Sequence, residues 1–206
     1  MSNTTEQNSS PTYLINIIKK ELHANMNGIA SAAMRQTEDY RVNFGVELPR
    51  LQNIATEFEP NHELAQALWK ESVRECRILA TLLMPAKGFD PELCDVWAGD
   101  IRTVELAQIF ALYLMRRLPY ASQKAFEWIA SERLMLQVLG YFTMCHVLRK
   151  GEMRDRSAEE LLDHLACDIQ SKEPKLQTAA VKTLQIYAAQ SEINAERAKK
   201  VTDYLF

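Results

Sequence analysis

Residues 130–137 read Ala-Ser-Glu-Arg-Leu-Met-Leu-Gln, and residues 170–177 read Gln-Ser-Lys-Glu-Pro-Lys-Leu-Gln. The two stretches lie 40 positions apart and match at Ser131 and Ser171 and at the Leu-Gln pairs that close them. In both, a polar joint precedes residues that begin a helical pattern. A period of this length is typical of proteins built from stacked helix pairs, in which no pair can bury its apolar face alone. The repeat therefore predicts a chain of stacked helix pairs.

Helical spacing of apolar residues continues on both sides of this repeat. Ser10 suits the N-cap of a first helix with Pro11 at its first position, and most later joints contain a Gly, a Pro or a capping residue. No strand-like alternation is long enough to compete. The pattern predicts about twelve helices, at residues 11–22, 28–35, 47–58, 61–71, 73–84, 90–98, 103–118, 120–130, 133–148, 157–169, 174–190 and 194–205.

The short joints make neighbouring helices antiparallel, which fits either a bundle or a solenoid. The 40-residue repeat favours the solenoid, so we expect an all-α superhelix of the HEAT or armadillo type that forms one domain over residues 10–206. An irregular helical bundle with accidental repeats is the alternative. Residues 1–9 are polar and lack the basic and apolar regions of a signal, so we expect a disordered N-terminal tail.

The composition suits a packed helical protein, because 47% of the 206 residues are hydrophobic and only 6 are Gly and 7 Pro. The four cysteines occur singly, without a Cys-x-x-Cys pair. We expect reduced core thiols, as in the cytosol, at Cys76, Cys94, Cys145 and Cys167. The longest apolar segments are too short to cross a bilayer. We therefore expect a cytoplasmic protein with no membrane role.

Three segments resemble those of a known family. Residues 43–51, Asn-Phe-Gly-Val-Glu-Leu-Pro-Arg-Leu, followed by Ile54-Ala55, are similar to the Gly-Val-x-x-Pro-x-Leu-x-x-Ile-Ala segment of the HEAT-like DNA alkylation repair proteins. Leu68-Trp69 with residues 74–80, Arg-Glu-Cys-Arg-Ile-Leu-Ala, resembles the family's next signature, and residues 128–131, Trp-Ile-Ala-Ser, resemble a further one. The resemblance covers about residues 10–205, and by it the chain is identified as a divergent member.

The resemblance implies an alkylpurine DNA glycosylase, which excises positively charged methylated purines from DNA held along a concave, basic surface. In this family the site consists of a Trp-Trp-Asp-x-x-Asp stretch, an Arg on the following repeat and a Trp-x-x-Arg pair on a later helix. Aromatic faces attract a cationic base and a sugar with developing positive charge, while a carboxylate opposes that charge and aligns water.

The residues aligned with that site differ from the family pattern. Residues 100–105, Asp-Ile-Arg-Thr-Val-Glu, align with the Trp-Trp-Asp-x-x-Asp stretch, which puts Ile101 in place of the key aromatic residue and Glu105 in place of the key Asp. The later Arg falls on Val138, and the Trp-x-x-Arg pair falls on Lys182 and Gln185. We therefore expect an altered or inactive glycosylase site in which Glu105 is the candidate catalytic carboxylate.

Trp97 is the tryptophan nearest to this stretch, about one turn before Asp100 and two turns before Glu105. It is the candidate for a displaced aromatic platform. A shift of the alignment by one turn would instead bring Arg102 or Asp100 into the site, but would not supply tryptophans.

Basic residues gather at helix ends, although the net charge of the chain is −3. If these ends face one side, they form a strip that follows DNA phosphates. Alternatively, several of them complement the dipoles of helix C-termini and stay solvated. The candidate DNA-binding residues are Arg102, Arg116, Arg117, Arg149, Lys150, Arg154, Lys175 and Lys182.

Other reactive residue types form no recognisable site. Cys145 and His146 are adjacent, so on a helix their side chains point about 100° apart, and we expect a core cysteine beside a boundary histidine. The four histidines have no His-x-x-x-His spacing and the glycines are isolated. We expect no metal and no cofactor.

From the family resemblance and the basic residues we therefore expect a DNA alkylation repair family protein that binds nucleic acid along a concave basic face. DNA is its expected partner. The alternative is a non-enzymatic α-solenoid scaffold that binds a protein in its groove. A basic groove favours nucleic acid, whereas an apolar or acidic groove favours protein.

Overall fold

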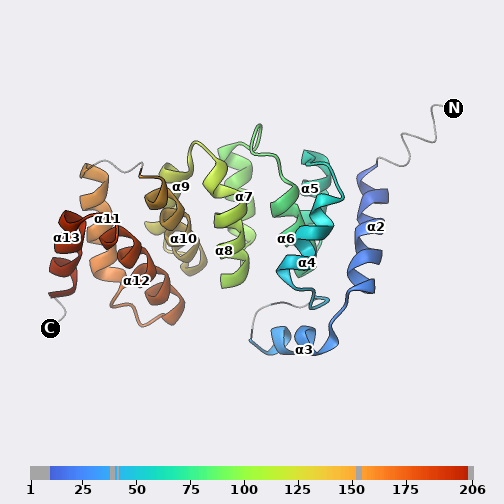
Figure 1. Ribbon diagram of the computed structural model, residues 1–206, viewed down its shortest axis with the longest axis horizontal. Coiled ribbons are helices and arrows are strands. Elements are labelled where there is room, and N and C mark those ends of the chain that lie inside the picture. Colours follow the sequence, from blue (N-terminus) through green and yellow to red (C-terminus); the bar gives the residue numbers. More distant parts are fainter. Residues whose placement is uncertain (1–9, 38–39, 41, 152–154, 204–206) are drawn as a thin grey trace. The chain divides into compact units, whose positions relative to one another are not determined.

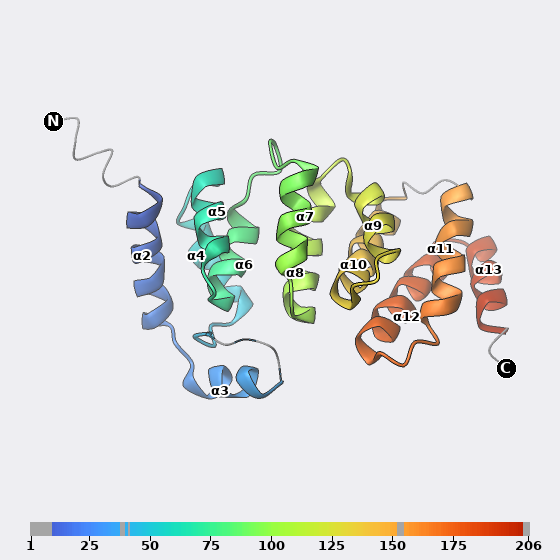
Figure 2. The same ribbon diagram turned by 180° about the vertical axis from the view of Figure 1, so that it is seen from behind.

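The computed structural model describes residues 10–37, 40, 42–151 and 155–203, so the tail predicted at residues 1–9 lies outside the described residues. Within these ranges the chain forms twelve α-helices and one 3₁₀ helix, with no β-strand among them (Figures 1 and 2). The predicted all-α fold of about twelve helices is confirmed. In chain order the elements are α2 (Pro11–Ala24), α3 (Gly28–Thr37), α4 (Leu48–Thr56), α5 (His62–Lys70), α6 (Arg74–Leu83), α7 (Pro91–Asp100), α8 (Val104–Tyr113), η1 (Met115–Arg117), α9 (Ala121–Ile129), α10 (Leu134–Lys150), α11 (Asp155–Asp168), α12 (Pro174–Ala188) and α13 (Glu192–Asp203).

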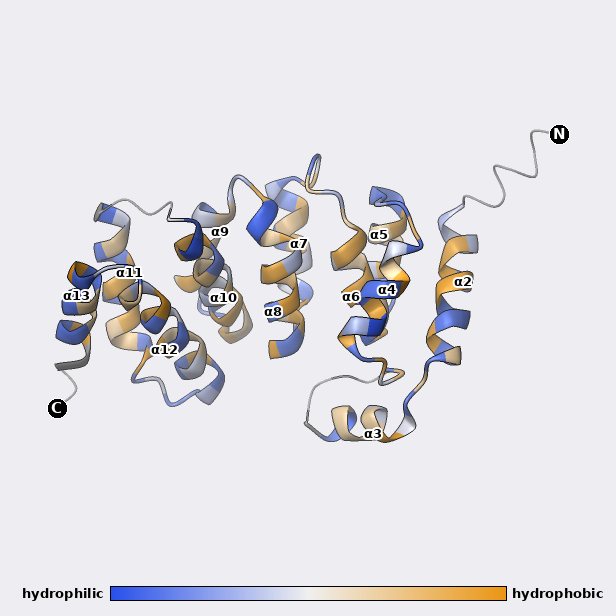
Figure 3. Cartoon of the chain, in the orientation of Figure 1, coloured by the Kyte–Doolittle hydropathy of each residue, from blue (hydrophilic) through white to orange (hydrophobic). Residues whose placement is uncertain are grey.

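The chain divides into two compact units, Met1–Trp97 and Ala98–Phe206. In the N-terminal unit, α5 packs against α2 and α6, and α4 also packs against α6. In the C-terminal unit, α10 packs against α8, α9 and α12, while α13 packs against α11 and α12. Most of these helices carry both apolar and polar residues, as their mixed colours in Figure 3 show. No helix in the described part of the chain has the length and apolarity needed to span a membrane.

The 40-residue repeat is present in the structure. The Ser131 hydroxyl accepts a hydrogen bond from the backbone N–H of Arg133 at 3.1 Å, and the Ser171 hydroxyl accepts one from the N–H of Glu173 at 3.2 Å. Each of these turns leads directly into a helix, α10 in the first case and α12 in the second. The matched serines therefore mark equivalent joints of two successive repeats.

Helix α10 is the centre of the C-terminal unit, and Gly140 lets α9 approach it closely. A Cβ atom at this position would lie 2.8 Å from the backbone nitrogen of Ile129 and 2.9 Å from the carbonyl oxygen of Ala125. Backbone atoms cannot yield as a flexible side chain can. The side of α10 that contains Gly140 is therefore fixed against α9.

A buried ion pair fastens a loop in the N-terminal unit. Glu75 is 0% exposed and its carboxylate accepts hydrogen bonds from the backbone N–H groups of Phe44 at 3.0 Å and Val46 at 3.2 Å. Arg74, also buried, lies 3.0 Å from the Glu75 carboxylate and donates to the carbonyl of Val46 at 2.8 Å. The first residues of α6 therefore hold the loop that leads into α4.

The helix predicted at residues 103–118 is shorter in the structure. Helix α8 ends at Tyr113, and Met115–Arg117 form the 3₁₀ helix η1. Pro119 disfavours helical backbone geometry at the residue before it, Leu118, which adopts an extended conformation. Arg116 and Arg117 consequently belong to η1 and not to the last turn of a long helix.

The prediction of core thiols is confirmed for three cysteines and wrong for Cys167. Cys76, Cys94 and Cys145 are buried, whereas Cys167 is exposed. The buried side of α11 contains Leu161 and Leu165, which are spaced one turn apart. Cys167 follows Leu165 by two residues and so points about 200° around the helix, toward solvent.

Candidate functional site

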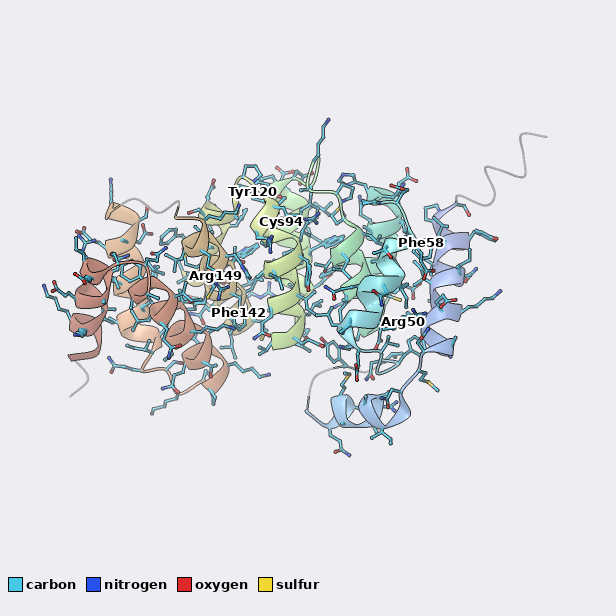
Figure 4. The ribbon with its side chains drawn as sticks, viewed as in Figure 1. Arg50, Phe58, Cys94, Tyr120, Phe142 and Arg149 are labelled. Carbon is cyan, nitrogen blue, oxygen red and sulfur yellow. The ribbon has the colours of Figure 1, made fainter. Side chains whose placement is uncertain are left out.

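A stripe of four side chains runs along the second half of α10. Phe142, Cys145, His146 and Arg149 are spaced at i, i+3, i+4 and i+7, so they share one side of the helix. Phe142 and Cys145 are buried, His146 is half-buried and Arg149 is exposed. Figure 4 labels Phe142 and Arg149 on this helix. The stripe therefore passes from an apolar end to a cationic end.

Two neighbouring helices complete a groove over this stripe. Helix α8 contributes Gln108 and Leu112, and α12 contributes Lys182. The groove has a volume of ≈ 240 Å³. The Lys182 ammonium lies 5.7 Å from the ring centroid of Phe142, within the range of a cation–π interaction. We call this feature the basic groove; it is lined by Gln108, Leu112, Phe142, Cys145, His146, Arg149 and Lys182.

The pKa of His146 reflects the positive charges around the basic groove. The pKa of His146 is lowered from 6.5 to about 4, chiefly by burial and in addition by the positive charges of Arg149, Arg116 and Lys182. Arg116 thus acts on the groove from η1, although it does not line it. Three of the predicted basic residues, from three different elements, are therefore brought together around one histidine.

The neighbouring Cys145 is a buried thiol. Burial raises its pKa, while a hydrogen bond with Thr183 and the charges of Arg149 and Lys182 oppose that rise. The Sγ of Cys145 lies 3.3 Å from the hydroxyl of Thr183. Because the thiol stays protonated near neutral pH, it is a poor nucleophile, as expected for a core cysteine beside a boundary histidine.

We predict that Arg149→Gln raises the pKa of His146 above about 4, because of the three positive charges that lower this pKa, that of Arg149 has the largest effect. The NMR signal of the histidine Cε1 proton, followed against pH, measures this value. In the wild type the folded state binds fewer protons than the unfolded chain between about pH 4 and 6.5, so stability falls on acidification through that window. The fall should be smaller in Arg149→Gln. A pKa that does not move would contradict the proximity of the two groups.

Lys150, Lys175 and Arg117 are not among the residues that line the groove. Lys150 is exposed and, with Arg149, lines an adjoining hollow of ≈ 560 Å³ at the end of α10. Lys175 is exposed on α12, seven residues before Lys182 and so on the same side of that helix. Arg117 is exposed on η1, and partial burial and the charge of Arg116 lower its pKa. Arg154 lies outside the described residues.

Two of the positions aligned with the glycosylase site are in the core. Ile101 and Val138 are both 0% exposed. Lys182 and Gln185, aligned with the Trp-x-x-Arg pair, are exposed on α12. Glu105 is half-buried in the first turn of α8, where a carboxylate interacts favourably with the helix dipole.

Arg102 lies at the end of α7. It is exposed, and its guanidinium donates to the carbonyl of Gly99 at 2.8 Å. Arg133 donates to the same carbonyl at 2.7 Å. The two guanidinium groups therefore cap the C-terminus of α7, where a positive charge is favourable.

Trp97 lies in the core of the N-terminal unit. Its ring is 2% exposed and stacks on Trp69 with centroids 4.2 Å apart and planes at 4°. Phe89 meets it edge-on at 5.2 Å. A platform for a nucleobase needs an open ring face. In this structure the Trp97 ring offers none, and it belongs to a different unit from Glu105.

Four residues that line the basic groove were not predicted from the sequence as residues of a site: Phe142, His146, Gln108 and Leu112. One sequence feature could have indicated the groove: in residues 142–149, a His and an Arg occur at helical spacing within an otherwise largely apolar helix. Gln108 and Leu112 carry no such signal. Within the described ranges, no three His, Cys, Asp or Glu side chains are grouped as a metal site would require.

Comparison with known proteins places the chain in a family. The sequence pattern of the family described as "DNA alkylation repair enzyme" matches residues 18–198. A solved structure also resembles this chain, with a TM-score of 0.81 and 18% sequence identity; the match covers 91% of this chain and 81% of that chain. That structure comes from a family of proteins related to the HEAT-like repeat DNA glycosylases, with affinity for branched DNA structures. No curated protein sequence matches the chain. The structural likeness confirms the predicted HEAT-like helical-repeat fold, and the match to the family pattern over most of the chain shows that this protein belongs to the DNA alkylation repair enzyme family.

Proposed function

We propose that this protein binds DNA through the cations around the basic groove. The observation that carries the proposal is that Arg149 of α10 and Lys182 of α12 line one groove. Arg116 of η1 adds a third positive charge that acts on the groove's histidine. A phosphodiester backbone attracts such a cluster and releases counterions on binding. The affinity therefore comes from the local cluster of cations and decreases as the salt concentration rises. The cluster can therefore hold DNA although the net charge of the chain is −3. Membership of a DNA repair family supports DNA as the polyanion.

The test is the triple substitution Arg116→Gln, Arg149→Gln and Lys182→Gln. We expect it to weaken binding of a labelled DNA duplex about tenfold or more, and to reduce the slope of log K against log salt by about 2–3. Fluorescence anisotropy titrations at several salt concentrations measure both quantities. The matched control removes three exposed lysines of the N-terminal unit, Lys20, Lys70 and Lys87, which changes the net charge by the same amount. Equal losses in the two triple variants would show that only total charge matters.

The form of the DNA is a second part of the proposal. The structural relative has affinity for branched DNA structures. We propose that this chain also prefers a four-way junction to a linear duplex of equal length. A junction places phosphates of different arms close together, so that a compact cluster of cations meets more charge than on one duplex. Competition between unlabelled junction and duplex for the same labelled probe measures the preference.

We further propose that the protein does not excise alkylated purines. Ile101 and Val138 lie in the core, where the resemblance implies an aromatic residue and an arginine of the site, and neither provides a face or a charge to a cationic base. Incubation with DNA containing methylated purines should therefore release no more base than a sample without protein. Release that disappears in Glu105→Gln would contradict this and would make Glu105 a catalytic residue.

A further inference from the structure

His146 has a distinctive position in the basic groove. It is half-buried on the same side of α10 as Phe142 and Arg149, and it lines the groove together with Lys182 of α12. Among the residues that line the groove are two cations and no carboxylate. The groove is thus a concave, positively charged site with a neutral hydrogen-bonding group on its wall.

The charged and titratable groups that face His146 come from three elements. Arg149 and the Cys145 thiol are on α10 itself, Arg116 is on η1 and Lys182 is on α12. Helix α8 adds Gln108 and Leu112, which are uncharged, and α9 packs against α10 at Gly140. Every charge acting on His146 from these groups is positive. An anion in the groove would oppose that local field and favour the charged form of the histidine.

We propose that the basic groove holds one phosphate group of the bound DNA and that His146 takes up a proton as the phosphate enters. This inference rests on the proposed function and adds the ligand group and its chemistry. A neutral imidazole has one N–H donor, whereas an imidazolium has two and carries a charge. Proton uptake therefore gives the phosphate an additional charge-assisted hydrogen bond beside Arg149 and Lys182.

The direction of the pH dependence follows from the two states of the site. In the free protein His146 titrates at about pH 4, so it is neutral at pH 7. A phosphate beside the ring raises its pKa, because the negative charge stabilises the imidazolium. Binding then becomes tighter as the pH falls, since the bound state holds more protons than the free state. A phosphodiester does not itself titrate in this range, so it does not mask the effect.

The experiment measures the affinity of the intact chain for a labelled DNA duplex between about pH 7.5 and pH 5.5 at constant salt. We expect binding to tighten by about threefold or more beyond the change seen in His146→Gln. The matched control is His164→Gln, a half-buried histidine on α11 in the same unit, which should keep the wild-type pH dependence. Calorimetry in two buffers of different ionisation enthalpy should find uptake of up to about one proton for the wild type and less for His146→Gln.

A second measurement needs no substitution at His146. The NMR titration of the wild-type histidine should show the midpoint of His146 moving upward from about 4 when the duplex is saturating. Binding that depends on Arg149 but shows the same pH dependence in wild type and His146→Gln would overturn this inference and leave the proposed function intact. No binding to the duplex or junction at low salt would overturn both.

Discussion

Replacement of Glu75 by alanine is expected to lower the free energy of unfolding of the N-terminal unit by about 3–5 kcal/mol, because it leaves a buried charge without its partner. Glu75 is 0% exposed, and its carboxylate is the acceptor for two loop N–H groups and for the buried Arg74. Without it, the Arg74 guanidinium loses its counter-charge in the core. The N–H groups of Phe44 and Val46 lose their acceptor at the same time, which adds a desolvation cost.

Urea unfolding measures this loss. A Trp128→Phe background leaves Trp69 and Trp97, both in the N-terminal unit, as the remaining tryptophans, so their fluorescence follows that unit. The control is Glu71→Ala, which breaks the partly exposed Lys19–Glu71 ion pair at 3.0 Å and should cost about 1 kcal/mol or less. Similar costs for the two variants would show that burial does not determine the strength of the Glu75 contacts.

The contacts of Glu75 explain why the sequence resembles the family so clearly in this region. Residues 43–51 and 74–80 are two of the three segments that carry the resemblance, and the structure joins them through the Glu75 carboxylate and the Arg74 guanidinium. The resemblance therefore reflects a structural requirement: a loop with several polar backbone groups must be buried against α6. This is why the segments predict the fold well and say little about chemistry.

The helices could be predicted from the sequence because each depends on neighbours within a few turns. The joints at Ser131 and Ser171 use the same local hydrogen bond, so the same residue recurs. The exposure of Cys167 follows from helical periodicity once the phase of α11 is set by Leu161 and Leu165. The end of η1 is also set locally, since Pro119 restricts the residue before it, Leu118, to an extended conformation.

The basic groove could not be predicted in the same way. Its residues come from α8, α10 and α12, and Gln108, His146 and Lys182 are separated by more than 30 positions from one another. Which of many exposed basic residues converge depends on how helices pack, and helical periodicity alone does not determine that. The effect of Arg116 on the pKa of His146 likewise depends on η1, whose residues were predicted to belong to a longer helix.

The burial of Trp97 shows the same limit from the opposite direction. Its spacing from Asp100 suggested an aromatic platform, yet the ring stacks on Trp69, which lies 28 positions earlier. An aromatic residue at helical spacing has the same sequence signature in a core as in a site, because both places favour large flat side chains. Only the packing partner distinguishes them.

Gly45→Ala is the second substitution for which we expect a large effect, a loss of about 3 kcal/mol or more in the free energy of unfolding. Gly45 has φ of 71°, and a Cβ atom there would lie 2.3 Å from the carbonyl oxygen of Asn27 and 2.6 Å from the backbone nitrogen of Ser31. The loop crosses the first turn of α3 at this point, where the backbone N–H of Asn27 donates to the carbonyl of Phe44 at 2.9 Å. Both obstructing atoms are backbone, so a side chain at residue 45 must push the loop away from α3.

Gly151 separates the two causes of that loss. It has the same φ of 71°, at the C-cap of α10, but a Cβ atom there would meet nothing within 4 Å. Gly151→Ala should therefore show the conformational cost alone, about 1–2 kcal/mol, when unfolding is followed by circular dichroism. The excess loss in Gly45→Ala then measures the close approach of the loop to α3. Equal losses in the two variants would show that Gly45 is needed for its backbone angle and not for its close contact with α3.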